Sequence, residues 1–98
     1  MTRFTVAVLP DAEAEIRAAF LWYFERSPLA ADAFRDAVIQ AIDGLVETAG
    51  DWPKDEDGTH RYHLKHFPYT VMYEIAGSEV TVLAVAHQRR RPNYWQQR

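Results

Sequence analysis

The sequence of 98 residues has a mass of 11.4 kDa, the size of one compact domain. It is 48% hydrophobic and 26% charged, which excludes a disordered tail, a collagen-like fibre and a coiled coil. The absence of cysteine excludes a disulfide scaffold, a thiolate zinc site and a cysteine nucleophile. No apolar stretch approaches the roughly 20 residues that span a bilayer, and no signal-peptide core opens the chain. We therefore expect a single cytoplasmic domain over residues 1–98.

The net charge of −3 conceals an uneven distribution along the chain. Residues 1–58 carry five basic and twelve acidic side chains, which gives −7. Residues 59–98 carry six basic and two acidic side chains, which gives +4, and they also contain all four histidines. Such a division predicts that the two parts face different partners, although they would also neutralise each other on a folded surface.

The first predicted elements are a strand and an amphipathic helix. Residues 3–9 are rich in apolar and β-branched types, which predicts a strand that ends at Pro10. Proline suits the first turn of a helix, where its missing N–H would have no partner. Trp22 and Phe24 lie off the apolar stripe of this helix, so they are candidates for contact with a partner protein. The stripe itself, at the spacing of a core-facing helix, consists of Ala12, Ile16, Ala19, Phe20 and Tyr23.

A second helix is predicted over residues 29–49. Ser27 can cap its first turn, and Pro28 separates it from the preceding helix. Two helices joined by so short a break form an antiparallel hairpin. The apolar stripe of the second helix consists of Phe34, Val38, Ala41, Ile42, Leu45 and Ala49.

Three strands are predicted in the second part, over residues 60–67, 69–76 and 79–87, with a turn at Gly77 and Ser78 between the last two. The last strand is apolar on both faces, as expected of a central strand. The predicted order is β-α-α-β-β-β. This is an α+β fold in which a helical hairpin packs on a mainly antiparallel four-stranded sheet of undetermined strand order.

Several familiar kinds of site are not predicted. His60, His63 and His66 are spaced like metal ligands, but on a strand His63 would face away from the other two, so no metal site is expected. No glycine-rich phosphate-binding loop is present, and no cofactor is expected. Ser27 and Ser78 are explained as a helix cap and a turn residue, which disfavours a serine hydrolase.

The segment after the last strand is the strongest candidate for function. His87 is followed by three arginines, whose forked side chains match phosphate oxygens, and by aromatic rings that can stack on bases. Arg61 and Lys65 would extend this basic surface. The structural alternative is that Tyr94 and Trp95 pack onto the sheet while the arginines keep the chain soluble. The residues expected to bind a target are Arg89, Arg90, Arg91, Tyr94, Trp95 and Lys65.

The sequence resembles the RelE/ParE superfamily of toxins from bacterial type II toxin–antitoxin modules. The resemblance covers nearly the whole chain and lies in the order and spacing of several short motifs. These are Leu9-Pro10 with Ala12 and Glu15, Trp22-Tyr23, Ser27-Pro28, Phe34, Trp52-Pro53, Arg61 with Leu64, Phe67-Pro68-Tyr69 with Tyr73, and His87 before Arg89-Arg90-Arg91-Pro92 and Tyr94-Trp95. The predicted order of elements agrees with the fold of this superfamily.

The resemblance implies a toxin that is neutralised, in a hetero-oligomer, by an antitoxin of ParD or similar type encoded beside it. ParE-like members bind and poison DNA gyrase without nuclease chemistry. RelE-like members are ribosome-dependent endoribonucleases that cut mRNA. In that alternative His87 would be the base, Arg61 and Arg89 or Arg90 would hold the phosphate, and Tyr94 would stack on a nucleobase. A non-toxic binding relative is the third possibility.

Two observations favour the ParE-like alternative. Nuclease members usually carry an arginine directly after the tyrosine that opens the middle strand, but here Thr70 follows Tyr69. The net charge of −3 is also unlike that of the strongly basic toxins that bind the ribosome. We therefore expect a ParE-like gyrase inhibitor of the plasmid-stabilisation type, with Trp22 and Phe24 at the antitoxin surface.

Overall fold

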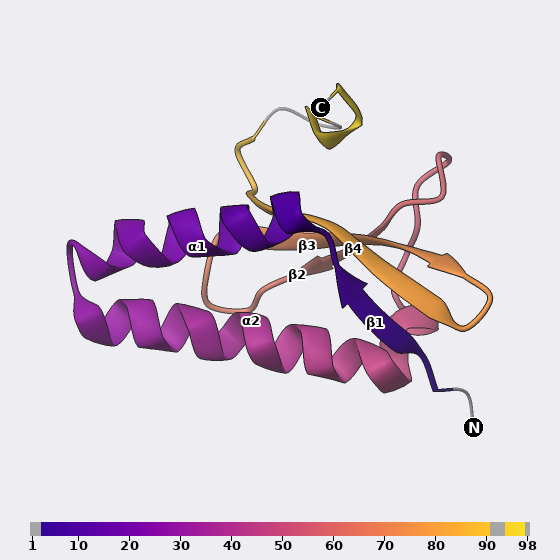
Figure 1. Ribbon diagram of the computed structural model, residues 1–98, viewed down its shortest axis with the longest axis horizontal. Coiled ribbons are helices and arrows are strands. Elements are labelled where there is room, and N and C mark those ends of the chain that lie inside the picture. The colour runs from indigo at the N-terminus through magenta and orange to yellow at the C-terminus, as the bar shows by residue number, and fades with distance from the viewer. Residues whose placement is uncertain (1–2, 91–93, 98) are drawn as a thin grey trace.

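The computed structural model describes residues 3–90 and 94–97 of the chain. Two helices and four strands form one α+β domain (Figure 1). Short 3₁₀ turns follow the second helix, at Ala49–Asp51, and close the chain, at Tyr94–Gln97. The longer elements are β1 (Thr5–Val8), α1 (Pro10–Phe24), α2 (Pro28–Thr48), β2 (His60–His63), β3 (Tyr69–Ala76) and β4 (Glu79–His87).

The four strands form one mixed sheet in the order β1-β4-β3-β2. The β2–β3 and β3–β4 pairs are antiparallel, whereas β1 runs parallel to β4. The predicted order of elements, the mainly antiparallel sheet and the central place of the last strand are confirmed. β4 is apolar on both faces because strands flank it and packed layers cover it on both sides.

The helices form the predicted antiparallel hairpin (Figure 1). Pro10 occupies the first turn of α1, and the Ser27 hydroxyl caps α2 by accepting the Ala30 N–H at 3.2 Å. The predicted stripes face the sheet, and Phe34, Val38 and Leu45 are at most 2% exposed. No helix within residues 3–90 and 94–97 is long and apolar enough to cross a membrane.

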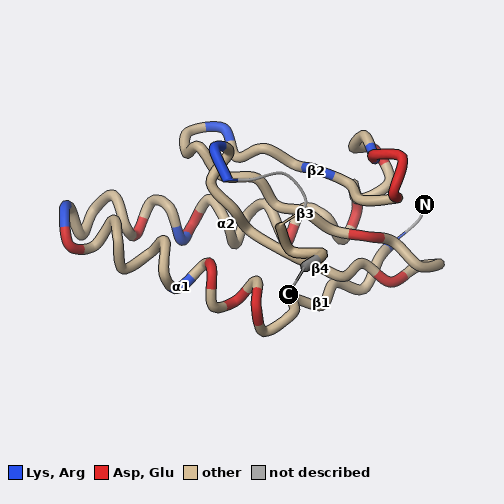
Figure 2. Tube along the Cα trace, turned by 90° about the horizontal axis from the view of Figure 1, so that it is seen from above, with Lys and Arg blue, Asp and Glu red and all other residues tan. Residues whose placement is uncertain are grey.

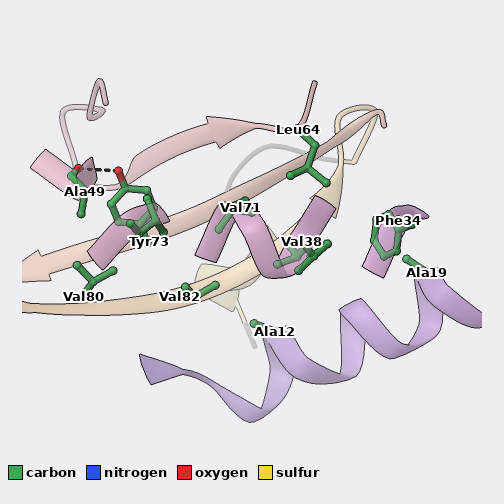
Figure 3. Close-up of a cluster of buried hydrophobic side chains, with 13 residues drawn as sticks. Ala12, Ala19, Phe34, Val38, Ala49, Leu64, Val71, Tyr73, Val80 and Val82 are labelled. Atoms are coloured by element: carbon green, nitrogen blue, oxygen red, sulfur yellow. Dashed lines mark hydrogen bonds between the residues drawn. The ribbon is translucent and has the colours of Figure 1, made fainter. Parts of the chain in front are cut away.

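The main core lies between the helical hairpin and one face of the sheet (Figure 3). At one end of this core, the ring of Phe34 packs against the rings of Tyr23, Phe67 and Tyr69, with centroid distances of 5.1–5.5 Å. Fully buried Tyr73 occupies the other end. These aromatic rings join both helices to β3 and to the loop before it, so they fix the hairpin on the sheet.

A β-bulge in β4 changes which residues of the strand face each of the two apolar clusters. Tyr73 pairs with Val82 but Met72 pairs with Ala84, so the register steps over Leu83. Val82 packs in the helical core, whereas Ala84 packs in a second cluster on the opposite face of the sheet. The bulge therefore shifts the alternation by one residue: Val82 before it and Val85 after it face the helical core, whereas Ala84 faces the other side.

The strand predicted over residues 60–67 is shorter than expected, because β2 ends at His63. The Leu64 N–H donates to the Tyr69 carbonyl at 2.9 Å, which starts the reversal towards β3 four residues early. The Phe67 ring then turns inward to contact Tyr23 and Phe34. The prediction was wrong here because burial of this ring in the helical core outweighed continuation of the strand.

Removal of the Tyr73 hydroxyl is expected to reduce the loss of stability at alkaline pH. This hydroxyl donates to the Ala49 carbonyl at 2.6 Å, and burial, assisted by the charge of Asp51, raises the pKa of Tyr73 to about 12 (Figure 3). Between pH 10 and 12 the unfolded tyrosine ionises while the folded one stays neutral, so the free energy of unfolding falls through that window.

Tyr73→Phe should be less stable at pH 7 by about 1 kcal/mol, because the Ala49 carbonyl loses its donor. Its urea midpoint should then fall less than that of the wild type between pH 9 and 12. The urea midpoint of Tyr73→Phe should still fall somewhat over this range, because burial also raises the pKa of Tyr69. Parallel curves for the two proteins would show that Tyr73 does not contribute to the alkaline transition.

Candidate functional site

Exposed basic side chains gather at one end of the sheet. The loop after β2 and the chain after β4 lie side by side there, because the Gln88 N–H donates to the Pro68 carbonyl at 2.8 Å. Figure 2 shows the basic segments of these two loops next to each other. We call this surface the basic end; its exposed cations are Lys65, Arg89 and Arg90. It unites three residues that the sequence predicted as target-binding.

Acidic residues lie at the opposite end of the sheet (Figure 2). The pairing of His60 with Tyr73, and of Tyr73 with Val82, places the acidic loop 51–57 near the β3–β4 turn. Glu79 starts β4 at that turn, while His87 ends it near the basic end. Within the sheet and its loops, basic and acidic residues thus lie towards opposite ends of the strands, which leaves the basic end distant from Glu79 and the loop 51–57.

The C-terminal turn crosses the face of the sheet that the helices leave open. Trp95 is 9% exposed and packs in the second apolar cluster with Met72, Ala84 and Ala86. The Gln96 side-chain amide donates to Asp57 Oδ2 at 2.7 Å. This packing corresponds to the structural alternative for Trp95. Arg91, also predicted to bind the target, lies outside the described residues.

Arg90 is positioned by a chain of contacts that reaches α1. Its guanidinium lies 3.9 Å from the centre of the Tyr94 ring, a cation–π contact. The Tyr94 hydroxyl donates to Glu15 Oε2, and the Val85 backbone N–H donates to Glu15 Oε1 at 3.1 Å. The Glu15 carboxylate of α1 therefore hydrogen-bonds both to β4 and to the C-terminal turn, and Arg90 packs on the Tyr94 ring of that turn.

A hollow of about 230 Å³ lies on the open face of the sheet, beside the C-terminal turn. It brings together five predicted residues, namely Arg61, His87, Arg90, Tyr94 and Trp95. Lys65 and Arg89 do not line it. His63 and Thr70 line it although the sequence did not indicate them as site residues, and His63 Nδ1 lies 2.6 Å from Thr70 Oγ1. The spacing of Arg61 and His63, two residues apart on one strand, was the signal that could have identified His63.

Two of the predicted residues are engaged in contacts within the protein. Arg61 Nη2 lies 2.6 Å from Asp55 Oδ2, and Arg61 Nε donates to the same oxygen at 2.8 Å. His87 Nδ1 accepts the Arg89 N–H at 3.1 Å, so the neutral imidazole carries its proton on Nε2. The charge of Arg61 is thereby balanced, and the remaining nitrogen of His87 is a hydrogen-bond donor rather than the acceptor that a general base requires.

The two residues predicted to contact an antitoxin are exposed, each by 50% of its surface. The Arg26 guanidinium lies 3.7 Å from the centre of the Trp22 ring, and the Phe24 ring stacks on Phe20 at 6.0 Å. Trp22 also lines a groove that opens towards Arg90, whereas Phe24 does not. The structure therefore separates the two predicted residues between a groove and the end of the helical hairpin.

Comparisons with known proteins identify the family. Residues 6–92 match the family of the "ParE toxin of type II toxin-antitoxin system, parDE". A solved structure titled "Chromosomal ParDE TA system from P. aeruginosa" is similar in fold, with a TM-score of 0.77 and 17% sequence identity. The similarity covers 87% of this chain and 96% of that one. Comparison with curated protein sequences gives no match. Because the family model spans almost the whole domain, the chain belongs to the ParE toxins of type II toxin–antitoxin systems.

Proposed function

We propose that this chain inhibits DNA gyrase without catalysing a reaction and that a cognate ParD-like antitoxin neutralises it in a hetero-oligomer. Membership of the ParE family supports the antitoxin partner. The proposal for the target rests on the basic end, where Lys65, Arg89 and Arg90 are exposed. The acidic loop 51–57 lies at the other end of the sheet (Figure 2). Gyrase and its DNA are cytoplasmic, so the proposal assigns the toxin to the cytoplasm.

The contacts of the open sheet face favour a binding role over nuclease chemistry. Cleavage of RNA by attack of a 2′-hydroxyl needs a proton acceptor and uncompensated cations around the phosphate. His87 presents an N–H in its neutral form, and Asp55 balances Arg61. Thr70, at the position where nuclease members usually carry an arginine, is 5% exposed and contacts His63. Among the described residues that line this hollow, Arg90 is the cation that has no acidic partner at salt-bridge distance.

A RelE-like ribonuclease is the second candidate, and one observation favours it. The hollow on the open sheet face gathers Arg61, His63, His87, Arg90 and Tyr94 around a space of about 230 Å³. Two imidazoles, two guanidiniums and a phenol are groups that suit a phosphodiester. In this candidate the C-terminal turn would form one wall of the site.

A gyrase supercoiling assay, run beside a ribosome-dependent mRNA cleavage assay, distinguishes the candidates. We expect the purified chain to block supercoiling by gyrase and to leave mRNA intact. Addition of the purified antitoxin should restore supercoiling. Cleavage of mRNA at defined codon positions with gyrase unaffected would replace the proposal with the ribonuclease. Inactivity in both assays, with the antitoxin still bound, would identify a non-toxic binding relative.

A further inference from the structure

β1 forms one margin of the sheet, and its outer edge carries backbone groups that point away from the other strands. On its inner side β1 pairs with β4, and among residues 3–90 and 94–97 no strand pairs with its outer side (Figure 2). The N–H groups of Thr5 and Leu9 donate to carbonyls of the β3–β4 turn and of β4, at 2.9 and 3.0 Å. Because backbone groups alternate in direction along a strand, Val6 and Val8 direct their N–H and C=O groups outward.

Four backbone groups of this edge are available to a partner strand. Just before β1, Phe4 donates its N–H to the Val46 carbonyl of α2 at 2.7 Å. Just after it, Pro10 has no N–H and begins α1. The available part of the edge is therefore the N–H and the C=O group of Val6 and those of Val8. Such groups at the margin of a sheet pair with another extended strand.

The spacing of these groups suits a second copy of the same strand. When two β1 strands pair antiparallel about a two-fold axis at Ala7, Val6 of each copy lies opposite Val8 of the other copy. Each of these pairs exchanges two hydrogen bonds, so the outward groups of both copies are all used. An axis at Val6 or at Val8 leaves one valine carbonyl unpaired in each copy. Phe4 has already donated its N–H in the first case, and Pro10 has none in the second.

The side chains beside this axis are small or apolar. Val6 and Val8 pack against the helical core, so Thr5, Ala7 and Leu9 face the other side of the sheet. Ala7 is exposed and would meet Ala7 of the other copy at the axis, where strands approach closely. Leu9 is 40% exposed, and the same register covers it by placing it opposite Thr5 of the other copy.

The charges at the two ends of the strand are complementary in this register. Arg3 precedes β1, and its side chain is 69% exposed. Asp11 lies in the first turn of α1 and is exposed as well. With the axis at Ala7, Arg3 of each copy lies beside the start of the helix that carries Asp11 of the other copy. Two pairs of opposite charge therefore flank the shared strands.

We propose that the β1 edge joins two copies of this chain into a symmetric dimer, in which antiparallel β1 strands make one continuous sheet. The pairing is independent of the proposed target, because Lys65, Arg89 and Arg90 follow β2 and β4 and take no part in it. Each dimer consequently presents two basic ends.

Ala7→Lys tests the edge by sedimentation equilibrium of the full chain without antitoxin. The wild type should approach twice its monomer mass of 11.4 kDa as its concentration rises. Ala7 is exposed, so a lysine there does not enter the core, but it places like charges directly opposite each other at the axis. The variant should raise the dissociation constant of the dimer by at least about 10-fold, with an unchanged melting temperature.

Ala76→Lys is the matched control. Ala76 is exposed on β3, which does not pair with β1, so the same change of charge should leave the dissociation constant within about 2-fold of the wild type. Equal weakening in the two lysine variants would overturn the proposal, and so would a wild type that stays monomeric at every concentration. Loss of affinity for the purified antitoxin in Ala7→Lys, with a monomeric wild type, would assign the edge to the antitoxin instead.

A charge exchange tests the register. Arg3→Glu places a carboxylate beside Asp11 of the other copy, and Asp11→Arg places two arginines together, so each single variant should weaken the dimer. Arg3→Glu/Asp11→Arg restores opposite charges and should dimerise more tightly than either single variant. A double variant as weak as the weaker single variant would contradict the axis at Ala7.

Discussion

Replacement of Arg89 and Arg90 by alanine is expected to abolish inhibition of gyrase while leaving the fold intact. Both side chains are exposed and follow the last residue of β4, so their removal leaves the core unchanged. A hydrogen bond to a charged group contributes roughly 1.5–3 kcal/mol. Loss of two such contacts should therefore raise the toxin concentration needed for half-inhibition of supercoiling by at least about 100-fold.

The matched control for this variant removes two arginines from the helical hairpin. Arg17→Ala/Arg35→Ala changes the net charge by the same amount, and both residues line a hollow on the hairpin rather than the basic end. It should inhibit gyrase as the wild type does. Equal loss of potency in the two double variants would attribute the effect to net charge, and wild-type potency of the Arg89/Arg90 variant would contradict the assignment of the basic end as the target surface.

Val82→Asp is expected to produce the largest loss of stability of any substitution considered for this chain. Val82 is 0% exposed, lies between β1 and β3, and packs in the helical core near Ala12 (Figure 3). An unpaired carboxylate there costs several kcal/mol. A domain of this size has a total stability of about 5–15 kcal/mol. The variant should therefore be largely unfolded by circular dichroism at 25 °C, or else show a strongly reduced urea midpoint.

Two further variants separate buried charge from lost volume. Val82→Ala removes two methyl groups and should cost about 1–3 kcal/mol while the protein remains folded. Leu83→Asp should be much milder than Val82→Asp, because Leu83 is half-buried at the bulge. The sequence alone, which indicates a central strand over residues 79–87, predicts instead that Leu83→Asp unfolds the protein. Comparable unfolding of both aspartate variants would show that the bulge does not separate the two faces.

The elements of this fold were predictable because their signals are local. Apolar residues three and four apart indicated both helices, and the burial of Phe34, Val38 and Leu45 confirms the predicted stripe of α2. The turn at Gly77 and Ser78 marked the last hairpin, and β3 and β4 have the predicted bounds. The error at the end of β2 arose where burial of Phe67, a contact distant in sequence, determined the path of the chain.

The candidate site was predictable in composition but not in arrangement. The arginine run after β4 identified Arg89 and Arg90, and the tertiary structure placed Lys65 beside them through one backbone hydrogen bond. The burial of Trp95 and the pairing of Arg61 with Asp55 could not be predicted from the sequence. The residues next to such a side chain along the chain are the same whether it is exposed or in contact with another part of the protein.

The sequence by itself determined the order of helices and strands, the family resemblance and the uneven charge, since each depends on residue types and short spacings. Only the tertiary structure determined where the charged residues lie relative to one another. Antiparallel pairing set the basic end at one end of the sheet and Glu79, with the acidic loop 51–57, at the other (Figure 2). It also joined Glu15 to Tyr94, 79 residues apart, beneath Arg90. Contacts at that separation depend on the packing of the whole domain, which no local pattern encodes.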